Sequence, residues 1–247
     1  MKKMKAYVLT ALIFCISFFS NHSNAQQMAS DNKSLNEKEK SIIIISSLAA
    51  KGDLDKLKSG LQEGLDAGLT VNEIKEVLVH LYAYCGFPRS IRGLQTFMEV
   101  LKERKTEGIS DIEGKVVSPI NNDSSKYERG KKVLGELTKI PQSNTLTGYS
   151  AFAPAIDTFL KEHLFADIFE RDVLTYAQRE LVTISVIATI GNADPMLQSH
   201  LGISLNVGIT SEQLKEFVKI IKTTAGKKNA KSAWEVLEQV LKGRQLQ

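Results

Sequence analysis

Cysteine is scarce in this sequence, which has two cysteines among its 247 residues. Cys15 lies in an apolar segment near the N-terminus, so an exported and processed chain would keep Cys85 alone. A chain with one cysteine cannot form an internal disulfide, and chemistry that needs two thiols in the same chain is excluded too. The stability of the fold must therefore come from its apolar core and from assembly.

Long apolar runs are also missing. The apolar segment at residues 6–19 is too short to span a bilayer, and no later run approaches it. Three lysines precede this segment, and the small residues Ser23 and Ala25 follow it, which is the pattern of a secretory signal peptide. We therefore predict that residues 1–25 are removed and that the mature chain is periplasmic or secreted, with no stable membrane insertion. A retained N-terminal anchor is the alternative.

An excess of one charge is absent from the mature chain. Residues 1–25 carry three lysines and no acidic residue, so their removal lowers the formal net charge from +4 to +1. A nucleic-acid partner requires a clustered cationic face, which this balance does not provide. We expect no nucleic-acid partner.

What the sequence does contain is an internal repeat. A shift of 140 residues places 55–76 on 195–216 with eight identities, where chance gives about one or two. The matched pairs are Leu57/Leu197, Ser59/Ser199, Leu61/Leu201, Leu65/Leu205, Gly68/Gly208, Thr70/Thr210, Lys75/Lys215 and Glu76/Glu216. Upstream, a shift shorter by one residue pairs "LNEKEKSIIIISSLAA" with "LTYAQRELVTISVIATI".

Each repeat has the pattern of helices. Gly68 and Gly208 stand where a helix ends, and the capping boxes "TVNE" and "TSEQ" start the next one. Residues 42–50 and 181–190 are apolar all round and β-branched, but their length and helical flanks favour buried helices over strands. We also assign Phe97, Phe217 and Trp234 to the core.

The fold class that these patterns predict is all-α, with two related helical units in one chain. We place the first unit at residues 35–103, a Gly/Ser/Asp/Asn-rich linker at 104–126 and the second unit at 127–247.

Glu180 and His200 are the residues of the second unit that could carry chemistry. They lie twenty residues apart, on two helices that a short turn can make antiparallel. A carboxylate that faces an imidazole fixes the tautomer of the ring and makes it a usable proton donor or acceptor. The same spacing also fits a structural hydrogen-bonded pair.

Two segments resemble the carboxymuconolactone decarboxylase family, which includes the alkylhydroperoxidase D branch. They are "LTYAQRELVTISVIATIGNADPMLQSHLGISLNVGIT", preceded by "HLFADIFERDVL", and "LTVNEIKEVLVHLYAYCGFPRSIRGLQTF". The resemblance covers about residues 35–103 and 127–241. It implies an all-helical alkylhydroperoxidase D-like fold of two fused units and assembly into homo-oligomers, trimers or hexamers.

The resemblance also narrows the chemistry. The peroxidase branch of the family has a Cys-x-x-Cys pair just before the histidine, and this sequence has Ala193 and Met196 at those positions. The decarboxylase-like branch resembles the Glu180/His200 arrangement without cysteines. It implies a carboxy-lyase without a cofactor that acts on a small carboxylated lactone or related acid, with His200 as general acid and Glu180 as its orienter. Arg171 matches a family arginine and is the candidate to hold the substrate carboxylate; a surface arginine at a helix end is the alternative.

The two units differ at the positions that matter. The first unit has Ser41 and Gly60 where the second has Glu180 and His200, but it keeps "YCGFP" where the second has "TAGKKNA". We therefore predict one composite site within a chain or at an interface. His80 and Tyr84 of the first unit are its candidate substrate-binding residues, with a helix-packing role as the alternative for His80.

Two other functions stay open at this stage. One is an antioxidant activity of the peroxidase type that uses Cys85 with an external thiol, although "AYCGF" lacks basic neighbours that would activate the thiol. The other is a non-enzymatic oligomer that binds a small acid. No ligand spacing indicates a metal site. Export also fits poorly with aromatic catabolism, which is normally cytoplasmic.

Overall fold

The computed structural model describes residues 34–120 and 123–245, so the predicted signal peptide lies outside the described residues. Within these ranges the chain forms helices and connecting segments and no strand. The predicted all-α fold is confirmed, and residues 42–50 and 181–190 lie in helices.

Two sets of four helices follow one another along the chain. The first half consists of α2 (Glu37–Lys51), α3 (Leu54–Asp66), α4 (Val71–His80) and α5 (Tyr82–Thr106). The second half consists of α9 (Tyr176–Ile190), α10 (Asp194–Asn206), α11 (Ser211–Thr224) and α12 (Lys227–Gln245). α2 and α9 both have 15 residues, and α3 and α10 both have 13, as expected for a repeated unit.

The predicted helix boundaries depend on local side-chain chemistry. The side chains of Thr70 and Thr210 each accept a hydrogen bond from a backbone N–H three residues later. The side chains of Glu73 and Gln213 accept in turn from the backbone N–H of Thr70 and Thr210. Gly208, which ends the turn before α11, has a positive φ of 99° that a residue with a Cβ rarely adopts. Both capping boxes are therefore confirmed.

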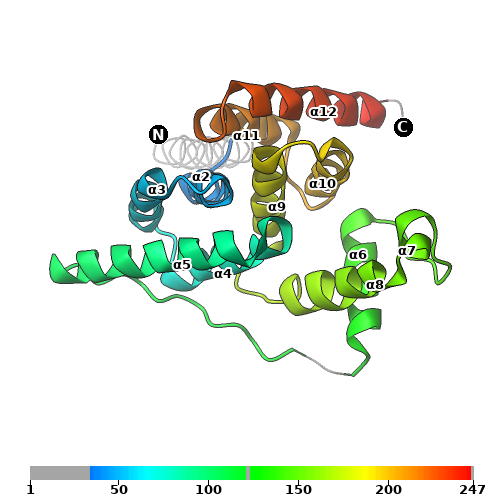
Figure 1. Ribbon diagram of the computed structural model, residues 1–247, viewed down its shortest axis with the longest axis horizontal. Coiled ribbons are helices and arrows are strands. Elements are labelled where there is room, and N and C mark those ends of the chain that lie inside the picture. The colour runs from blue at the N-terminus through cyan, green and yellow to red at the C-terminus, as the bar shows by residue number, and fades with distance from the viewer. Residues whose placement is uncertain (1–33, 121–122, 246–247) are drawn as a thin grey trace, which may run out of the picture.

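α2 and α9 form the centre of the molecule and pack against each other. Figure 1 shows α9 in the middle, with α4 and α5 on one side and α11 and α12 on the other. Phe97 and Phe217 are buried in the main core, as predicted. The assignment of Trp234 to the core is wrong, since 39% of the residue is exposed in a groove that α11 and α12 line with lysines.

A smaller helical layer precedes the second half. It contains α6 (Lys126–Thr138), α7 (Gly148–Phe152), α8 (Pro154–Thr158) and the π-helix η1 (Phe159–Ile168). α6 packs on η1, and the two helices share a second apolar core with α10. The members of this second core are Val133, Leu137, Leu164, Phe165, Ile168, Phe169 and Ile203.

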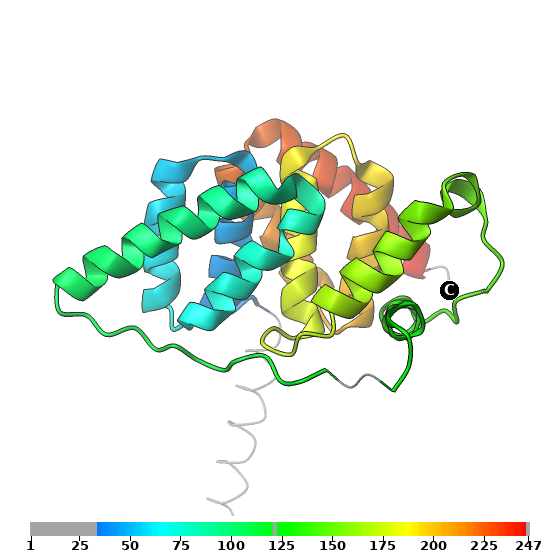
Figure 2. The same ribbon diagram turned by 60° about the horizontal axis from the view of Figure 1, so that its bottom comes forward.

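The segment that joins α5 to α6 runs along the outside of the first half (Figure 2). The first backbone N–H groups of α4, at Val71 and Asn72, donate hydrogen bonds of 2.9 Å to the carbonyls of Ile112 and Glu113. These N–H groups have no partner inside their own helix, so the joining segment extends the capping of α4.

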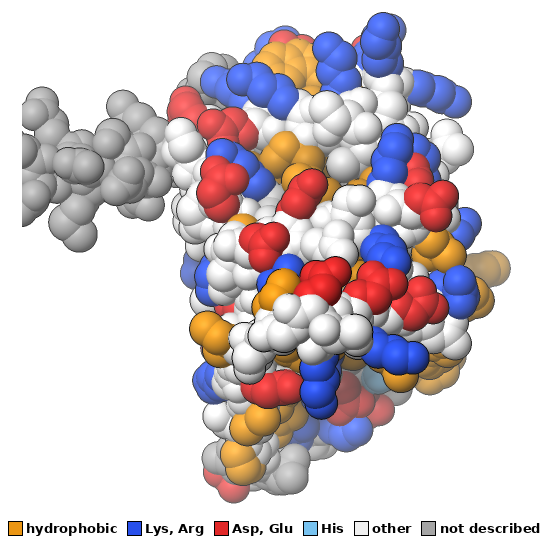
Figure 3. Space-filling model, turned by 90° about the vertical axis from the view of Figure 1, so that its left-hand side faces the viewer, with side chains coloured by type: hydrophobic (Ala, Val, Ile, Leu, Met, Phe, Trp, Pro, Cys, Tyr) orange, Lys and Arg blue, Asp and Glu red, His pale blue; other side chains and the backbone are white. Residues whose placement is uncertain are grey.

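The surface carries both signs of charge. On the side of the molecule shown in Figure 3, Lys/Arg and Asp/Glu side chains are interspersed. None of the helices in the described ranges is long and apolar enough to cross a membrane.

The contact between α6 and η1 depends on Gly130. A Cβ at this position would lie 1.7 Å from the carbonyl oxygen of Lys161, whereas a Cβ at Gly135 on the same helix would come no closer than 3.4 Å to its neighbour. We predict that Gly130→Ala lowers the free energy of unfolding by about 1–3 kcal/mol, because the two backbones must separate.

Gly135→Ala is the matched control and should raise the free energy of unfolding by up to about 1 kcal/mol, through helix propensity alone. Urea unfolding followed by circular dichroism measures both. Equal effects of the two substitutions would contradict the close contact.

Candidate functional site

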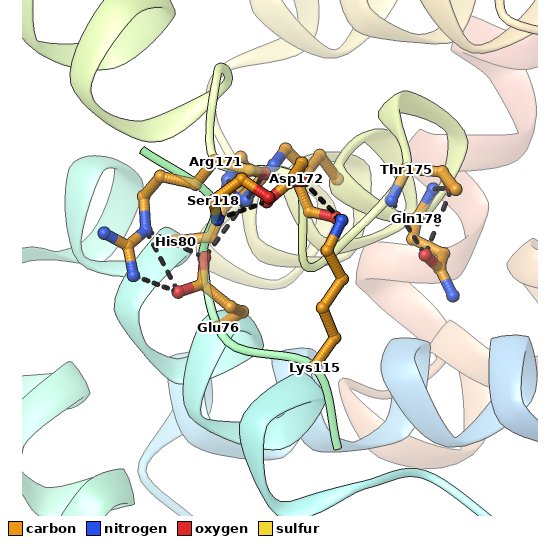
Figure 4. Close-up of polar contacts among 9 residues, drawn as sticks. Glu76, His80, Lys115, Ser118, Arg171, Asp172, Thr175 and Gln178 are labelled. Atoms are coloured by element: carbon orange, nitrogen blue, oxygen red, sulfur yellow. Dashed lines mark hydrogen bonds and ion pairs between the residues drawn. The ribbon is translucent and has the colours of Figure 1, made fainter. Parts of the chain in front are cut away.

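α9 positions three side chains of the candidate site. Its first turn is fixed by a capping box between Thr175 and Gln178, two of the residues drawn in Figure 4. Successive residues of a helix point about 100° apart. Arg179 and Thr183 therefore face α4, while Glu180 faces α10.

The structure brings Glu180 and His200 into direct contact. Nδ1 of His200 lies 2.9 Å from Oε2 of Glu180. The Glu180 side chain is fully buried, and 14% of the His200 side chain is exposed. Since a carboxylate can only accept, Nδ1 carries the proton of this hydrogen bond. The second ring nitrogen, Nε2, is left to face a ligand, and this arrangement can transfer a proton.

A buried ion cluster lies beside this pair. Glu76 on α4 binds Arg179, with 3.0 Å between the oxygen and the nitrogen, and also binds Arg171 through two guanidinium nitrogens (Figure 4). Burial by itself would raise the pKa of Glu76, but the hydrogen bonds and charges of the two arginines outweigh burial and lower this pKa. The carboxylate is therefore ionised and holds α4 to α9.

Arg171 contacts a residue that the sequence analysis did not predict as its partner. We predicted that its guanidinium holds a substrate carboxylate, but the guanidinium binds Glu76 inside the fold. Glu76 also binds Arg179, so one carboxylate faces two guanidinium groups and does not neutralise both. The structure shows a contact that holds Arg171 to the fold, and the predicted substrate contact stays a prediction.

His80 connects the ion cluster to the centre of the site. The residue is fully buried; its Nδ1 lies 3.2 Å from Nη1 of Arg179, and its Nε2 lies 2.9 Å from Oγ1 of Thr183. A guanidinium can only donate, so Nδ1 accepts and the ring proton is on Nε2. Burial and the charges of Arg179 and His200 lower the pKa of His80 well below its ordinary value, so the ring is neutral.

Tyr84 joins His80 to His200. A break in α5 at Gly86, with φ 81° and ψ 163°, turns the short "YCGFP" segment across the site. The centroid of the Tyr84 ring lies 5.6 Å from that of His80 and 5.9 Å from that of His200. Burial, and next the charge of Glu180, raise the pKa of Tyr84 far above its ordinary value. Its hydroxyl stays protonated and can donate.

The four residues of the predicted composite site lie together within one chain. The first half contributes His80 and Tyr84, and the second half contributes Glu180 and His200. Four cavities found among the described residues lie elsewhere, and His200 lines none of them. The ring of Tyr84 packs between His200 and His80, and Tyr84 also packs on the second apolar core.

Cys85 lies next to the site but is not activated. Its Sγ donates to the carbonyl of Leu81 at 3.2 Å, and burial raises the pKa of the thiol to about 11. A thiol with this pKa is almost entirely protonated near neutrality, which disfavours it as a nucleophile. In the described part of the chain, no group of three or more His, Cys, Asp or Glu side chains could hold a metal ion.

Our sequence analysis missed Glu76, Arg179 and Thr183. The signal for Glu76 was present, because this residue is one of the eight identities of the repeat. A charged residue at the start of an almost wholly apolar helix, as Arg179 is, also indicates a buried partner.

Comparison with known proteins identifies one family in both halves of the chain. Residues 21–97 and 154–239 match the carboxymuconolactone decarboxylase family, once in each half. A 4-carboxymuconolactone decarboxylase of Acinetobacter baylyi is 29% identical over 122 residues, which are 49% of this chain and 90% of the relative. The uncharacterized protein MJ1511 of Methanocaldococcus jannaschii is 28% identical over 86 residues, which are 35% of this chain and 80% of that protein.

The lowered pKa of His80 predicts a specific dependence of stability on pH. Below the unfolded-state pKa of about 6.5 the unfolded chain binds a proton that the folded chain does not, so stability is present above that pH and is lost as the pH falls. The loss approaches about 1.4 kcal/mol per pH unit for this group. In His80→Gln the stability curve should be flatter between pH 6.5 and 5 than in the wild type.

Urea unfolding at several pH values measures this difference. The exposed His163 provides the control, and His163→Gln should leave the slope close to that of the wild type. An unchanged slope in His80→Gln would show that His80 is protonated in the folded state.

Proposed function

Because the chain belongs to the carboxymuconolactone decarboxylase family, we propose that it is an acid–base enzyme of the carboxy-lyase type. It acts without a cofactor on a small carboxylated lactone or a related acid. The 2.9 Å contact between Glu180 and His200 carries this proposal. The other half of the repeat has Ser41 and Gly60 at these positions, so the helical scaffold does not need the pair in order to form.

The reaction assigns a separate task to each residue. When the bond to the departing carboxylate breaks, its electron pair enters the remaining carbon framework as an enolate, and CO₂ leaves. Nε2 of His200 delivers a proton to the enolate carbon. Glu180 accepts the hydrogen bond from Nδ1, which orients the ring and stabilises the imidazolium form.

We predict that His200→Ala lowers turnover about 10²–10⁴-fold, because it removes the proton donor. Glu180→Gln should cost less, because it removes the orienting charge and keeps the proton donor. 4-Carboxymuconolactone is the first substrate to test, since a relative is named for it; other carboxylated lactones follow, with release of CO₂ as the signal.

His163→Ala is the control, because this histidine is half exposed on η1 and contacts Asp167 and Tyr82, neither of which belongs to the proposed site. All variants should keep the helical circular dichroism of the wild type. Equal activity of His200→Ala and wild type would refute the proposed role, and binding of these acids without turnover would favour the non-enzymatic function.

The proposal includes export and self-assembly. The pattern of residues 1–25 supports export, and exposed apolar side chains support assembly. α5 exposes Phe87, Ile91 and Met98, and the layer of α7 and η1 exposes Phe152 and Phe159. Large exposed apolar side chains of this kind mark interaction surfaces when they cluster.

We predict that the mature chain, residues 26–247, forms a homo-oligomer, most simply a trimer. Light scattering coupled to size exclusion measures its mass at micromolar concentration. Replacement of both Phe152 and Phe159 by Ser should shift the mass towards the monomer, because it removes apolar surface from the interface. A wild-type chain that runs as a monomer would contradict the prediction.

A further inference from the structure

The repeat allows scaffold residues to be separated from site residues. Glu76 and Arg179 correspond to Glu216 and Lys40 in the other half, where a carboxylate and a cation recur. Lys40 donates a hydrogen bond to Glu37, which raises the pKa of Lys40, and the charge of Glu216 adds to this effect. A carboxylate and a cation therefore stand at these positions in both halves, so we assign them to the scaffold.

The remaining polar residues of the cluster have no such counterpart. Each of them is replaced in the other half by an apolar or smaller residue. The pairs are His80/Ile220, Tyr84/Thr224, Thr183/Ile44, Glu180/Ser41 and His200/Gly60. These five side chains come from four helices and meet at one place, so they form a site that the scaffold itself does not require.

The hydrogen-bond directions at this place can be assigned in sequence. Arg179 donates to His80, and His80 donates from Nε2 to Oγ1 of Thr183. The Thr183 hydroxyl donates in turn to the carbonyl of Arg179 at 3.0 Å. The proton of Thr183 is thereby committed to the backbone, and Thr183 has no proton left to donate to Tyr84.

Three buried side-chain atoms lack a hydrogen-bond partner among the described residues. One is Nε of Arg179, in the ion cluster, and the other two lie beside His200. They are the hydroxyl of Tyr84 and Oε1 of Glu180, the carboxylate oxygen that His200 does not use. Both residues contact His200, Glu180 through its hydrogen bond and Tyr84 through its ring. Unpartnered buried groups destabilise a fold. Two such groups beside one imidazole therefore indicate that a bound group supplies the missing hydrogen bonds.

We propose that the Tyr84 hydroxyl and Oε1 of Glu180 form a subsite for one neutral hydroxyl group of the ligand. Tyr84 donates to the oxygen of that group, and the group donates its own proton to Glu180. A carboxylate does not fit there, because it has no proton to donate and Glu180 repels it. The substrate class is therefore an acid that carries a hydroxyl separate from its carboxylate.

This subsite rests on the proposed function and deepens it. An acid of this class keeps its hydroxyl while CO₂ leaves, so no proton has to be supplied to the subsite. Tyr84 and Glu180 would hold that hydroxyl while His200, which is hydrogen-bonded to the same Glu180 carboxylate, delivers its proton to the carbon. Tyr84 then touches the substrate and is a catalytic residue of the site.

Phenols provide a stable probe, because the hydroxyl of a phenol is neutral and can both accept from Tyr84 and donate to Glu180. We would titrate the purified chain with benzoate and with its 2-, 3- and 4-hydroxy derivatives, and obtain Kd from NMR shifts. At least one hydroxybenzoate should bind about tenfold more tightly than benzoate, the value expected for two added hydrogen bonds of which one is to a charge.

Tyr84→Phe keeps the ring and removes the hydroxyl. It should bring the preferred hydroxybenzoate to within about twofold of benzoate and leave the Kd of benzoate unchanged. Tyr82→Phe is the matched control, because the Tyr82 ring stacks on the exposed Phe87, and it should retain the preference. No preference in the wild type, no binding of any probe at millimolar concentration, or an intact preference in Tyr84→Phe would each overturn the subsite.

His200→Ala separates this inference from the proposed function. The variant should lose turnover and keep the preference for the hydroxyl, since Tyr84 and Glu180 remain. A preference that depends on Tyr84 in a chain that turns over no lactone would support the subsite and refute the lyase. Turnover by a chain without the preference would do the reverse.

Discussion

The burial of α9 is the constraint on which the rest of this structure depends. Residues 179–188 are buried without interruption, because α2 packs along one side and α4, α10 and α11 cover the others. A polar side chain on such a helix cannot reach water, so it must find a partner inside the protein. Arg179 donates a hydrogen bond to Glu76, and Thr183 accepts one from His80. One oxygen of Glu180 accepts a hydrogen bond from His200, and the other oxygen has no partner among the described residues.

The repeat allows the two halves to differ in what they bury. Both halves build the same four helices and the same turn chemistry, so either half could position a polar cluster between its neighbours. Only the polar cluster around α9 contains the histidines. The corresponding region around α2 contains small hydroxyl side chains, and Ser47 donates a hydrogen bond of 2.7 Å to Thr224 there. Duplication supplies a stable frame twice, and one copy can then carry buried groups that cost stability.

The sequence predicted those features that depend on interactions within a short segment of the chain. The capping boxes at Thr70 and Thr210 and the glycine turns act over three or four residues, so they could be assigned by inspection. Sequence reasoning failed for Trp234 and for the partner of Arg171. Whether a face of α12 is covered, and whether a guanidinium meets Glu76 from 95 residues away, depends on how distant helices pack.

The sequence by itself determined the helical class, the twofold repeat, the chemical asymmetry between its halves and the presence of a single cysteine, Cys85, within the repeat. Only the tertiary structure decided that Tyr84 and His80 stand beside His200 within one chain, that Arg171 is committed to Glu76, and that Tyr84 and Glu180 each keep an unpartnered atom. The reason is physical. Helix formation is governed by contacts within a few residues, whereas donors and acceptors on buried helices are matched by packing, which sequence separation does not constrain.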